Sequence, residues 1–389
     1  MKKERSVACS KLISIINNLD TSVDNVINAL TLGVDEVIFI YHYNIEERHQ
    51  NRITDVIRNY ADIKITFLEV DDKRDIERII DKNEGIVADI SGGRFLTMVL
   101  FEVALDKKLP IIYYDDEENC IKSYHEHKVL RTDVFKLSIK DIIELGGGHI
   151  TNQMHHAPDD RKTKEIVKNC VESSFDCYPK FISFVQRLNG ILSSSSKADD
   201  YTYYLSEKNL QKLETEEFHH KYQRLGLYEV VGNCLCFSSP SIIKMINASG
   251  TFLESYLYYT LLDSKLFDDV AMSSVIDFSS KKNRYQVVCE IDCMIIKDNR
   301  LLFVSCKSNK VETPSLNEIK MHNYTFGNKL SNSVLCTLDD LNIKSPSIYA
   351  KAKELEVAVI DTTSFVNKTV AKDFLSIIEG TYQFEKLPE

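Results

Sequence analysis

The first 148 residues alternate short apolar runs with helix-like stretches. Strand-like runs occur at residues 12–16, 37–41, 63–70, 85–90 and 110–114. Between the last two, the run FLTMVLFEVAL begins at Phe95 and predicts a packed helix, because it is apolar on nearly every side. Strands that alternate with helices favour a parallel sheet with right-handed crossovers. The sequence therefore predicts a Rossmann-like α/β domain over residues 1–148.

Three consecutive glycines at 146–148 indicate the end of this domain or a hinge. Residues 149–245 are polar and helix-prone, and they end in the strand-like run GLYEVVGNCLCF. We expect a small connecting domain there, with a winged-helix-like outline. Residues 246–389 then pass through a helix, a β-hairpin, and further helix and strand, which predicts a second α/β domain.

The composition is that of an ordinary globular protein, with 43% hydrophobic and 27% charged residues. No apolar run approaches the roughly 20 residues of a membrane span, and the start MKKERSVACS lacks a signal-peptide core. These features predict a cytoplasmic protein. The ten cysteines are scattered, and Cys234 and Cys236 have no second pair at zinc-finger spacing. We therefore expect most of them to be reduced, buried small hydrophobes.

The net charge of −10 constrains any role in nucleic-acid binding. A stable binder of duplex nucleic acid usually carries a basic face. The chain therefore has a local basic patch, requires a metal to offset its carboxylates, or does not bind nucleic acid.

Residues 287–307 predict a β-hairpin. Its arms are 287–296 and 301–307, and its turn is 297–300. If the arms pair symmetrically about the centre of the turn, Asp292 lies opposite Ser305.

The same register places Glu290 opposite Lys307. Because strand side chains alternate, these two residues would share one face with Asp292 and Ser305. The other face would be apolar and would belong to the core, formed by Cys289, Ile291, Cys293, Val304 and Cys306.

Two carboxylates and a lysine on one face suit metal-assisted phosphodiester hydrolysis. Carboxylate oxygens bind hard cations such as Mg²⁺ or Mn²⁺, and the cation lowers the pKa of a bound water. Lys307 would orient that water or stabilise charge in the transition state. The alternative is a simple cross-strand salt bridge between Glu290 and Lys307 on a solvated sheet face.

The helices on either side of the hairpin each carry an acid. Glu254 lies in the first turn of the apolar helix FLESYLYYTLL, and Thr313 and Pro314 begin a second helix that carries Glu318. Helix, hairpin and helix with an acid on each is the order of elements in a PD-(D/E)xK nuclease core.

Residues 250–335 resemble the nuclease half of the CRISPR ancillary nucleases in the segments GTFLE, CEID, LLFVSCKS and LNEIKMHNYTFGN. One departure is that Ser305 stands where the motif has an acid two residues before the lysine, so the acid must come from Glu290, Glu254 or Glu318. The candidate catalytic residues are Glu290, Asp292, Lys307 and Glu318. The candidate metal ligands are Asp292, Glu290, Glu254 and Cys306.

The segment Ile90 to Arg94, ISGGR, lies between a predicted strand and the packed helix. Glycines there allow a ligand to approach the backbone, helix N-terminal amides favour phosphate, and Arg94 can add a bidentate contact. Helix–sheet packing alone is the alternative explanation for the glycines, and simple packing is the alternative for Tyr41 and His42. The candidate ligand-binding residues, taken from three loops at one sheet edge, are Asn17, Asn18, Asp20, Thr21, Tyr41, His42, Ser91, Gly92, Gly93, Arg94 and Phe95.

The N-terminal part resembles the CARF sensor domain that this family joins to its nuclease. The resemblance covers most of the chain and is weakest in the middle. It implies a homodimer that binds a cyclic oligoadenylate across its two-fold axis, with cyclic tetra-adenylate as the first candidate, and a Mn²⁺- or Mg²⁺-dependent nuclease acting on DNA or RNA in type III CRISPR defence. The alternatives are a CARF-based regulator with an inactive nuclease fold, and a restriction-type enzyme without nucleotide control.

Overall fold

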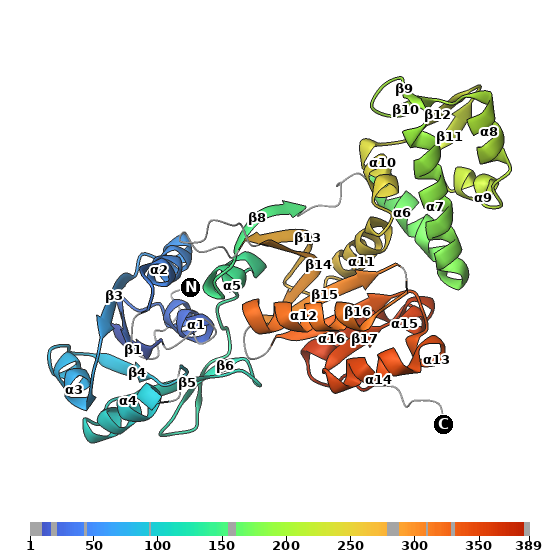
Figure 1. The fold of residues 1–389 in the computed structure, drawn as a ribbon. Helices are drawn as coiled ribbons and strands as arrows, with labels where there is room; N and C mark the ends of the chain where they lie inside the picture. Colours follow the sequence, from blue (N-terminus) through green and yellow to red (C-terminus); the bar gives the residue numbers. More distant parts are fainter. Residues whose placement is uncertain are drawn as a thin grey trace, which may run out of the picture.

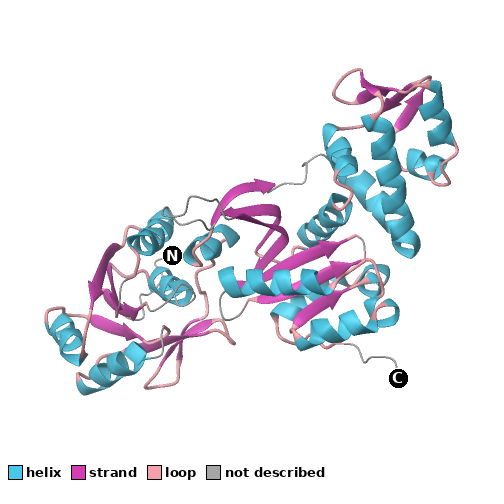
Figure 2. Ribbon diagram, viewed as in Figure 1, coloured by secondary structure: helices cyan, strands magenta, loops and turns pink. Residues whose placement is uncertain are grey.

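The computed structural model contains three sheets and describes residues 10–16, 22–42, 45–92, 95–154, 161–277, 288–308, 310–327 and 331–384. A six-stranded sheet lies between a seven-stranded N-terminal sheet and a small, mostly helical unit (Figures 1 and 2). Within these residues, the helices are too short or too polar to cross a membrane.

The N-terminal sheet has the strand order β3-β2-β1-β4-β5-β6-β7. Its parallel strands are β1 (Lys11–Ile15), β2 (Glu36–Tyr41), β3 (Lys64–Glu69), β4 (Ile86–Asp89) and β5 (Ile111–Asp115). The five strands expected from the sequence and their parallel pairing are confirmed. Two short antiparallel strands extend the edge and were not predicted: β6 (Cys120–Ser123) and β7 (Val129–Arg131).

Helices cover both faces of this sheet. One face carries α1 (Ser22–Leu32), α2 (Glu47–Tyr60) and α5 (Ile139–Leu145), and the other carries α3 (Lys73–Asp81) and α4 (Phe95–Asp106). Leu96, Leu100 and Val103 of α4 are buried. The predicted packed helix is therefore present, but only one side of it is packed, since Phe95 and Met98 on the other side are 72% and 71% exposed.

The middle of the chain is a helical unit with a small antiparallel sheet of order β11-β12-β10-β9. The helices are α6 (Arg161–Glu172), α7 (Tyr178–Ser193), α8 (Glu207–Glu214), α9 (His219–Arg224) and α10 (Pro240–Asn247), with a short 3₁₀ turn η1 (Phe175–Cys177). The strands are β9 (Ser196–Lys197), β10 (Thr202–Tyr204), β11 (Glu229–Val231) and β12 (Cys234–Cys236). The helix-prone character expected of this segment agrees with these five helices, whereas its description as a separate, winged-helix-like domain stays a prediction.

The six-stranded sheet has the order β17-β16-β15-β14-β13-β8. Its strands are β8 (His149–Met154), β13 (Asp269–Asp277), β14 (Val288–Lys297), β15 (Arg300–Lys307), β16 (Asn332–Thr337) and β17 (Val357–Ile360). Pairing is antiparallel from β8 to β15 and parallel from β15 to β17. The last strands therefore return through helical crossovers.

Helices also cover both faces of the six-stranded sheet. One face packs against α11 (Thr251–Ser264) and α16 (Val370–Ile378), and the other against α12 (Thr313–Phe326) and α14 (Pro346–Glu354). The remaining helices, α13 (Leu341–Lys344) and α15 (Thr362–Val366), are short.

The hydrophobic cores cross the predicted domain boundaries at residues 148 and 245. One continuous core joins α1, α2 and α5 of the first unit to α12 and α14 of the last, and another joins α6 and α7 to α11 and α16. Strand β8 follows the first boundary in the chain, yet it pairs with β13. At that boundary the glycines are closely packed, since a Cβ on Gly146 would lie 2.8 Å from the carbonyl oxygen of Phe326.

Candidate active site and sensor loop

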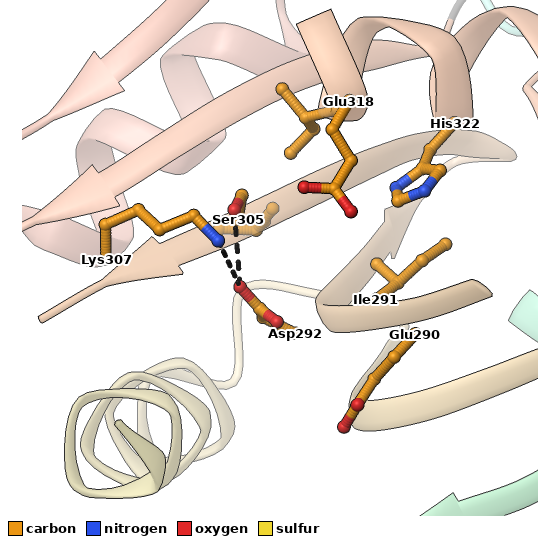
Figure 3. A pocket seen from close by; sticks show the side chains of 9 residues that line it. Glu290, Ile291, Asp292, Ser305, Lys307, Glu318 and His322 are labelled. Carbon is orange, nitrogen blue, oxygen red and sulfur yellow. Dashed lines mark hydrogen bonds and ion pairs between the residues drawn. The ribbon is translucent and has the colours of Figure 1, made fainter. Parts of the chain in front are cut away.

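A small pocket lies between the β14–β15 hairpin and helix α12 (Figure 3). The residues that line it are Glu290, Ile291, Asp292, Val304, Ser305, Lys307, Glu318, Ile319 and His322. The four residues that the sequence singled out as catalytic thus line one pocket. The predicted hairpin register is confirmed from Lys297, which faces Arg300, to Cys293, which faces Val304.

Asp292 is the most highly connected carboxylate in the pocket. It accepts a 2.7 Å hydrogen bond from the main-chain N–H of Cys306 and a 3.3 Å bond from the hydroxyl of Ser305. The Lys307 ammonium lies 3.9 Å away (Figure 3). Burial raises the pKa of Asp292, although Lys307 opposes the shift.

The predicted pairing of Glu290 with Lys307 is wrong, because Lys307 makes its ion pair with Asp292. Glu290 is exposed, and Figure 3 shows its carboxylate directed away from the Asp292–Lys307 pair. Of the two acids on β14, Asp292 is therefore the one that faces the lysine.

The reason lies in a change of side-chain direction at Asp292. In a regular strand Ile291 and Cys293 would share a face. In the structure Cys293 lies in the core beside α11, whereas Ile291 lies in the core beside α12. The neighbouring Ser273 on β13 has a φ of 46°, which breaks the regular pleat at this level. Strict alternation along the whole arm, as predicted, is therefore wrong at this point.

Glu254 approaches Asp292 from α11. Its carboxylate accepts a 3.0 Å hydrogen bond from the Ser273 hydroxyl. Burial, with added repulsion from the Asp292 and Glu290 carboxylates, raises the pKa of Glu254 to about 7. The negative charge of Asp292 and Glu254 is therefore only partly compensated by the Lys307 ammonium.

This donor set fits a hard divalent cation in its chemistry. Mg²⁺ typically takes one or two protein carboxylates and keeps several waters, so Asp292 and Glu254 suffice as protein ligands. Within the described part of the chain, no three His, Cys, Asp or Glu side chains are grouped closely enough to hold a metal. The Cys306 thiol lies in the core beside Cys336, so any contribution from Cys306 to a metal has to come from its main chain.

Helix α12 places two polar side chains above Asp292. Glu318 and His322 are four residues apart, one helical turn, and both line the pocket (Figure 3). Burial lowers the pKa of His322, against the pull of the Glu318 carboxylate. Glu318 was predicted from the sequence, but His322 was not. The spacing of four residues between His322 and Glu318 on one helix is the signal that could have identified His322.

The loop that follows β4 and begins at Ile90, the candidate sensor loop, rests on a buried polar cluster. Asp89 accepts hydrogen bonds from Ser14 Oγ at 2.7 Å, Asn28 Nδ2 at 3.0 Å and Ser91 Oγ at 2.6 Å. Asn25 Nδ2 donates to it at 3.2 Å. These donors tie β1, α1 and β4 together beneath the loop. Asp89, Asn25 and Asn28 were missed because strand and helix patterns do not mark buried polar residues.

The chain is tightly packed where the loop passes β1. A Cβ on Gly92 would lie 2.3 Å from the carbonyl oxygen of Ile15, so no larger residue fits there without a shift. Strands β2, β1 and β4 are parallel neighbours, so the loops that follow them leave from one sheet edge. Tyr41 and His42 are half-buried at that edge, and His42 Nδ1 contacts the carbonyl oxygen of Val70 at 2.9 Å.

Six predicted ligand-binding residues lie outside the described residues: Asn17, Asn18, Asp20, Thr21, Gly93 and Arg94. Their placement in the sensor edge stays a prediction. Ser91, Gly92 and Phe95 flank the loop as expected, and the last of these is highly exposed.

No protein-family model matches the sequence, and neither does any curated protein. Solved structures do match. Protein VC1899 from Vibrio cholerae superposes with a TM-score of 0.76 at 15% identity, covering 96% of this chain and 99% of that one. Can2 from Sulfobacillus thermosulfidooxidans, solved in complex with cyclic tetra-adenylate, superposes with a TM-score of 0.67 at 18% identity, covering 95% and 98%. This chain has the fold of Can2.

The match to Can2 extends over all three parts of the chain, because the superposition leaves out only 5% of it. The expected fold class, a Rossmann-like N-terminal sheet followed by a connecting unit and a C-terminal α/β unit, is thereby confirmed.

Proposed function

We propose that this protein is a metal-dependent nuclease activated by a cyclic oligoadenylate. The observation that carries the proposal is the pocket in which Asp292, Lys307 and Glu318 meet beside the buried Glu254. The fold shared with Can2, which was solved with cyclic tetra-adenylate, supports the choice of activator. The biological role we propose is type III CRISPR defence in the cytoplasm.

The chain's own groups have distinct roles in this proposal. Asp292 and Glu254 would hold the cation, which supplies an activated water and offsets charge on the phosphate. The Cys306 N–H and the Ser305 hydroxyl hold Asp292 in place. Lys307 reaches the same carboxylate and is placed to orient the water or to stabilise charge that develops on phosphorus.

A bound cation would also offset the negative charge that opposes binding of a polyanionic substrate. The chain carries −10 overall, and the pocket adds acids at the point where a phosphodiester would bind. Polyanionic substrate binds such a site only when the local charge is offset. We therefore propose Mg²⁺ or Mn²⁺ as an obligatory cofactor.

The proposed activator site is the edge of the N-terminal sheet near Ser91 and Gly92. We propose that two copies of the chain form it together. The exposed apolar face of α4 supports a homodimer, since Phe95, Met98 and Leu105 are 72%, 71% and 40% exposed on one helix. A second copy would bury this face next to the sensor loop.

One assay tests the proposal. Supercoiled plasmid, single-stranded DNA and RNA are incubated with the protein and Mn²⁺ or Mg²⁺, with and without each of a panel of cyclic oligoadenylates. We expect cleavage only with metal and at least one cyclic oligoadenylate, and none with Lys307→Ala. Full activity in excess chelator, or activity that ignores every cyclic oligoadenylate, would contradict it.

A second candidate function is a ligand-binding regulator whose nuclease fold is inactive. The observation that favours it is Ser305, which leaves one carboxylate fewer on β15 than the motif contains. Tight binding of a cyclic oligoadenylate, without cleavage of any substrate in the same assay, would support this function instead.

A further inference from the structure

The turn of the β14–β15 hairpin is buried against the N-terminal unit. Asn299 is 2% exposed. Its Nδ2 donates to the carbonyl oxygen of Phe135 at 2.9 Å, and its Oδ1 accepts from the N–H of Leu137 at 2.9 Å. The Asn299 side chain thus provides hydrogen-bond partners for one main-chain carbonyl and one main-chain N–H in the segment that leads from β7 to α5.

The next residue, Arg300, strengthens the same junction. Its guanidinium donates to the carbonyl oxygens of Asp116 at 2.6 Å and Glu117 at 2.9 Å, both directly after β5. It also donates to the carbonyl oxygen of Ile378, at the end of α16, at 2.8 Å. Arg300 therefore joins the tip of the hairpin to two separate parts of the fold.

The junction is continuous with the sensor loop. The N–H of Tyr114, on β5, donates to Ser91 Oγ at 2.8 Å. The Tyr114 hydroxyl donates to Asn119 Oδ1 at 2.6 Å, and burial raises the pKa of this hydroxyl against the opposing effect of the Asn299 side chain. Asp116, which accepts from Arg300, lies two residues further along the same segment. The C-terminal end of β5 and the residues directly after it thus contact both Ser91 and the hairpin turn.

The hairpin itself connects the turn to the pocket. Asn299 is seven residues from Asp292, and Arg300 is seven residues from Lys307. Seven residues of strand span about 23 Å, and the ladder from Lys297 to Cys293 pairs the two arms. A shift of the turn against β5 therefore changes the position of Asp292 and Lys307 together.

We propose that Asn299 and Arg300 are positioning residues that couple the sensor loop to the catalytic hairpin. This inference rests on the proposed function and names the route of its regulation. Coupling requires that ligand binding and hairpin position each bias the other. The test must therefore measure the coupling itself.

The substitution Asn299→Gly removes both side-chain bonds and leaves the turn unstrained. Asn299 has a φ of 63°, a conformation that glycine adopts readily. The matched control is Asp298→Gly in the same turn, where φ is 51°. Asp298 makes only partly exposed ion pairs, with Lys136 and Lys297, so its loss leaves the Asn299 bonds in place.

Each variant is assayed for plasmid cleavage with Mn²⁺, with and without cyclic tetra-adenylate, and for ligand affinity by calorimetry. We expect Asn299→Gly to reduce the ligand-induced stimulation of cleavage at least tenfold, with ligand affinity within about threefold of wild type. Asp298→Gly should keep wild-type stimulation. Arg300→Lys should fall between them, because one ammonium cannot reach three carbonyls in the fork geometry of a guanidinium.

Wild-type stimulation in Asn299→Gly would overturn the proposal and leave the proposed function intact. Equal losses in Asn299→Gly and Asp298→Gly would also overturn it, since the effect would then belong to the turn in general. A wild-type protein whose cleavage ignores cyclic tetra-adenylate and the other rings of the panel would overturn the proposed function, and this inference with it.

Discussion

Two carboxylate sites differ in how fully their charge is compensated, namely Asp89 in the N-terminal sheet and Asp292 with Glu254 at the pocket. Asp89, beneath the sensor loop, is fully buried and accepts from hydroxyl and amide donors on β1, α1 and its own loop. Asp292 and Glu254 are half-buried, and the pKa of each is raised, mainly by burial and for Glu254 also by the Asp292 carboxylate. Asp89 is thus the more deeply buried, and its partners are neutral hydroxyl and amide donors on three elements, whereas the two pocket acids add to each other's negative charge.

The difference separates structural acids from reactive ones. A buried carboxylate that is surrounded by hydrogen-bond donors stabilises the local fold, because its charge is compensated. A buried carboxylate beside another acid is short of positive charge, which a proton or a cation can supply, and such perturbed groups gather at functional sites. The comparison supports a structural role for Asp89 and the proposed catalytic role for Asp292 with Glu254.

The largest expected effect is on cleavage. Asp292→Asn removes the negative charge that faces both Lys307 and the proposed cation, so we expect the rate to fall at least about a thousandfold, roughly 4 kcal/mol of transition-state stabilisation. The rate of plasmid cleavage in Mn²⁺ and activator measures it. Ligand affinity should stay at the wild-type value, because the sensor lies elsewhere. The control is Asp373→Asn, because Asp373 is an acid on α16 that accepts a hydrogen bond from the Thr369 hydroxyl. Cleavage by Asp292→Asn at a normal rate would remove this pocket from consideration.

Substitution of Asp89 tests the other half of the comparison. In Asp89→Asn, an amide group faces the donors of Ser14, Asn28 and Ser91 in place of a carboxylate oxygen, and buried donors lose their partner. We expect the free energy of unfolding of the N-terminal unit to fall by about 3 kcal/mol. Asp292→Asn, by contrast, should change stability by less than about 1 kcal/mol. Denaturant midpoints of both variants measure the contrast, and equal losses would break it.

Local patterns in the sequence predicted a good deal of this architecture. The parallel strands, the hairpin register and the positions of Glu254 and Glu318 depend on short periodicities that side-chain alternation enforces. The pairing of β8 with β13 and the short β6 and β7 depend on distant partners, which no local pattern encodes. The same limit applies to the site. Lys307 forms its ion pair with Asp292 and not with Glu290. We attribute this to the break in the pleat beside Ser273, which lies on the neighbouring strand β13.

The pH dependence of stability should distinguish Glu254 from an ordinary surface acid. Its folded-state pKa of about 7 lies above the usual 4.5. As the pH rises, the unfolded chain releases this proton first, so stability is full below pH 4.5 and is lost as the pH rises to 7. The loss amounts to about 3 kcal/mol at most. In chelator, Glu254→Gln should flatten this slope and be the more stable protein at pH 8.

The control for this titration is Glu207→Gln, on the exposed first turn of α8. It should leave the slope between pH 4.5 and 7 as it is in the wild type. Addition of Mn²⁺ to the wild type should reduce the slope, because a bound cation favours the charged carboxylate. An unchanged slope in Glu254→Gln would mean that Asp292, whose pKa is also raised, holds the proton instead.

The smallest expected effect concerns Ser305, the residue that departs from the nuclease motif. Its hydroxyl donates to Asp292 at 3.3 Å, whereas the Cys306 N–H donates to the same oxygen at 2.7 Å. The shorter bond remains in Ser305→Ala, so we expect cleavage to slow only about two- to fivefold, on the order of 0.5–1 kcal/mol. A loss of a hundredfold would show that the hydroxyl contacts the cation or the water directly. Ser305→Glu restores the motif but adds an acid beside Asp292 and Glu254, which raises their pKa further unless a cation is bound. That variant should therefore stay active and change the Mn²⁺ concentration at half-maximal rate, and an unaltered metal titration would show that residue 305 lies outside the metal site.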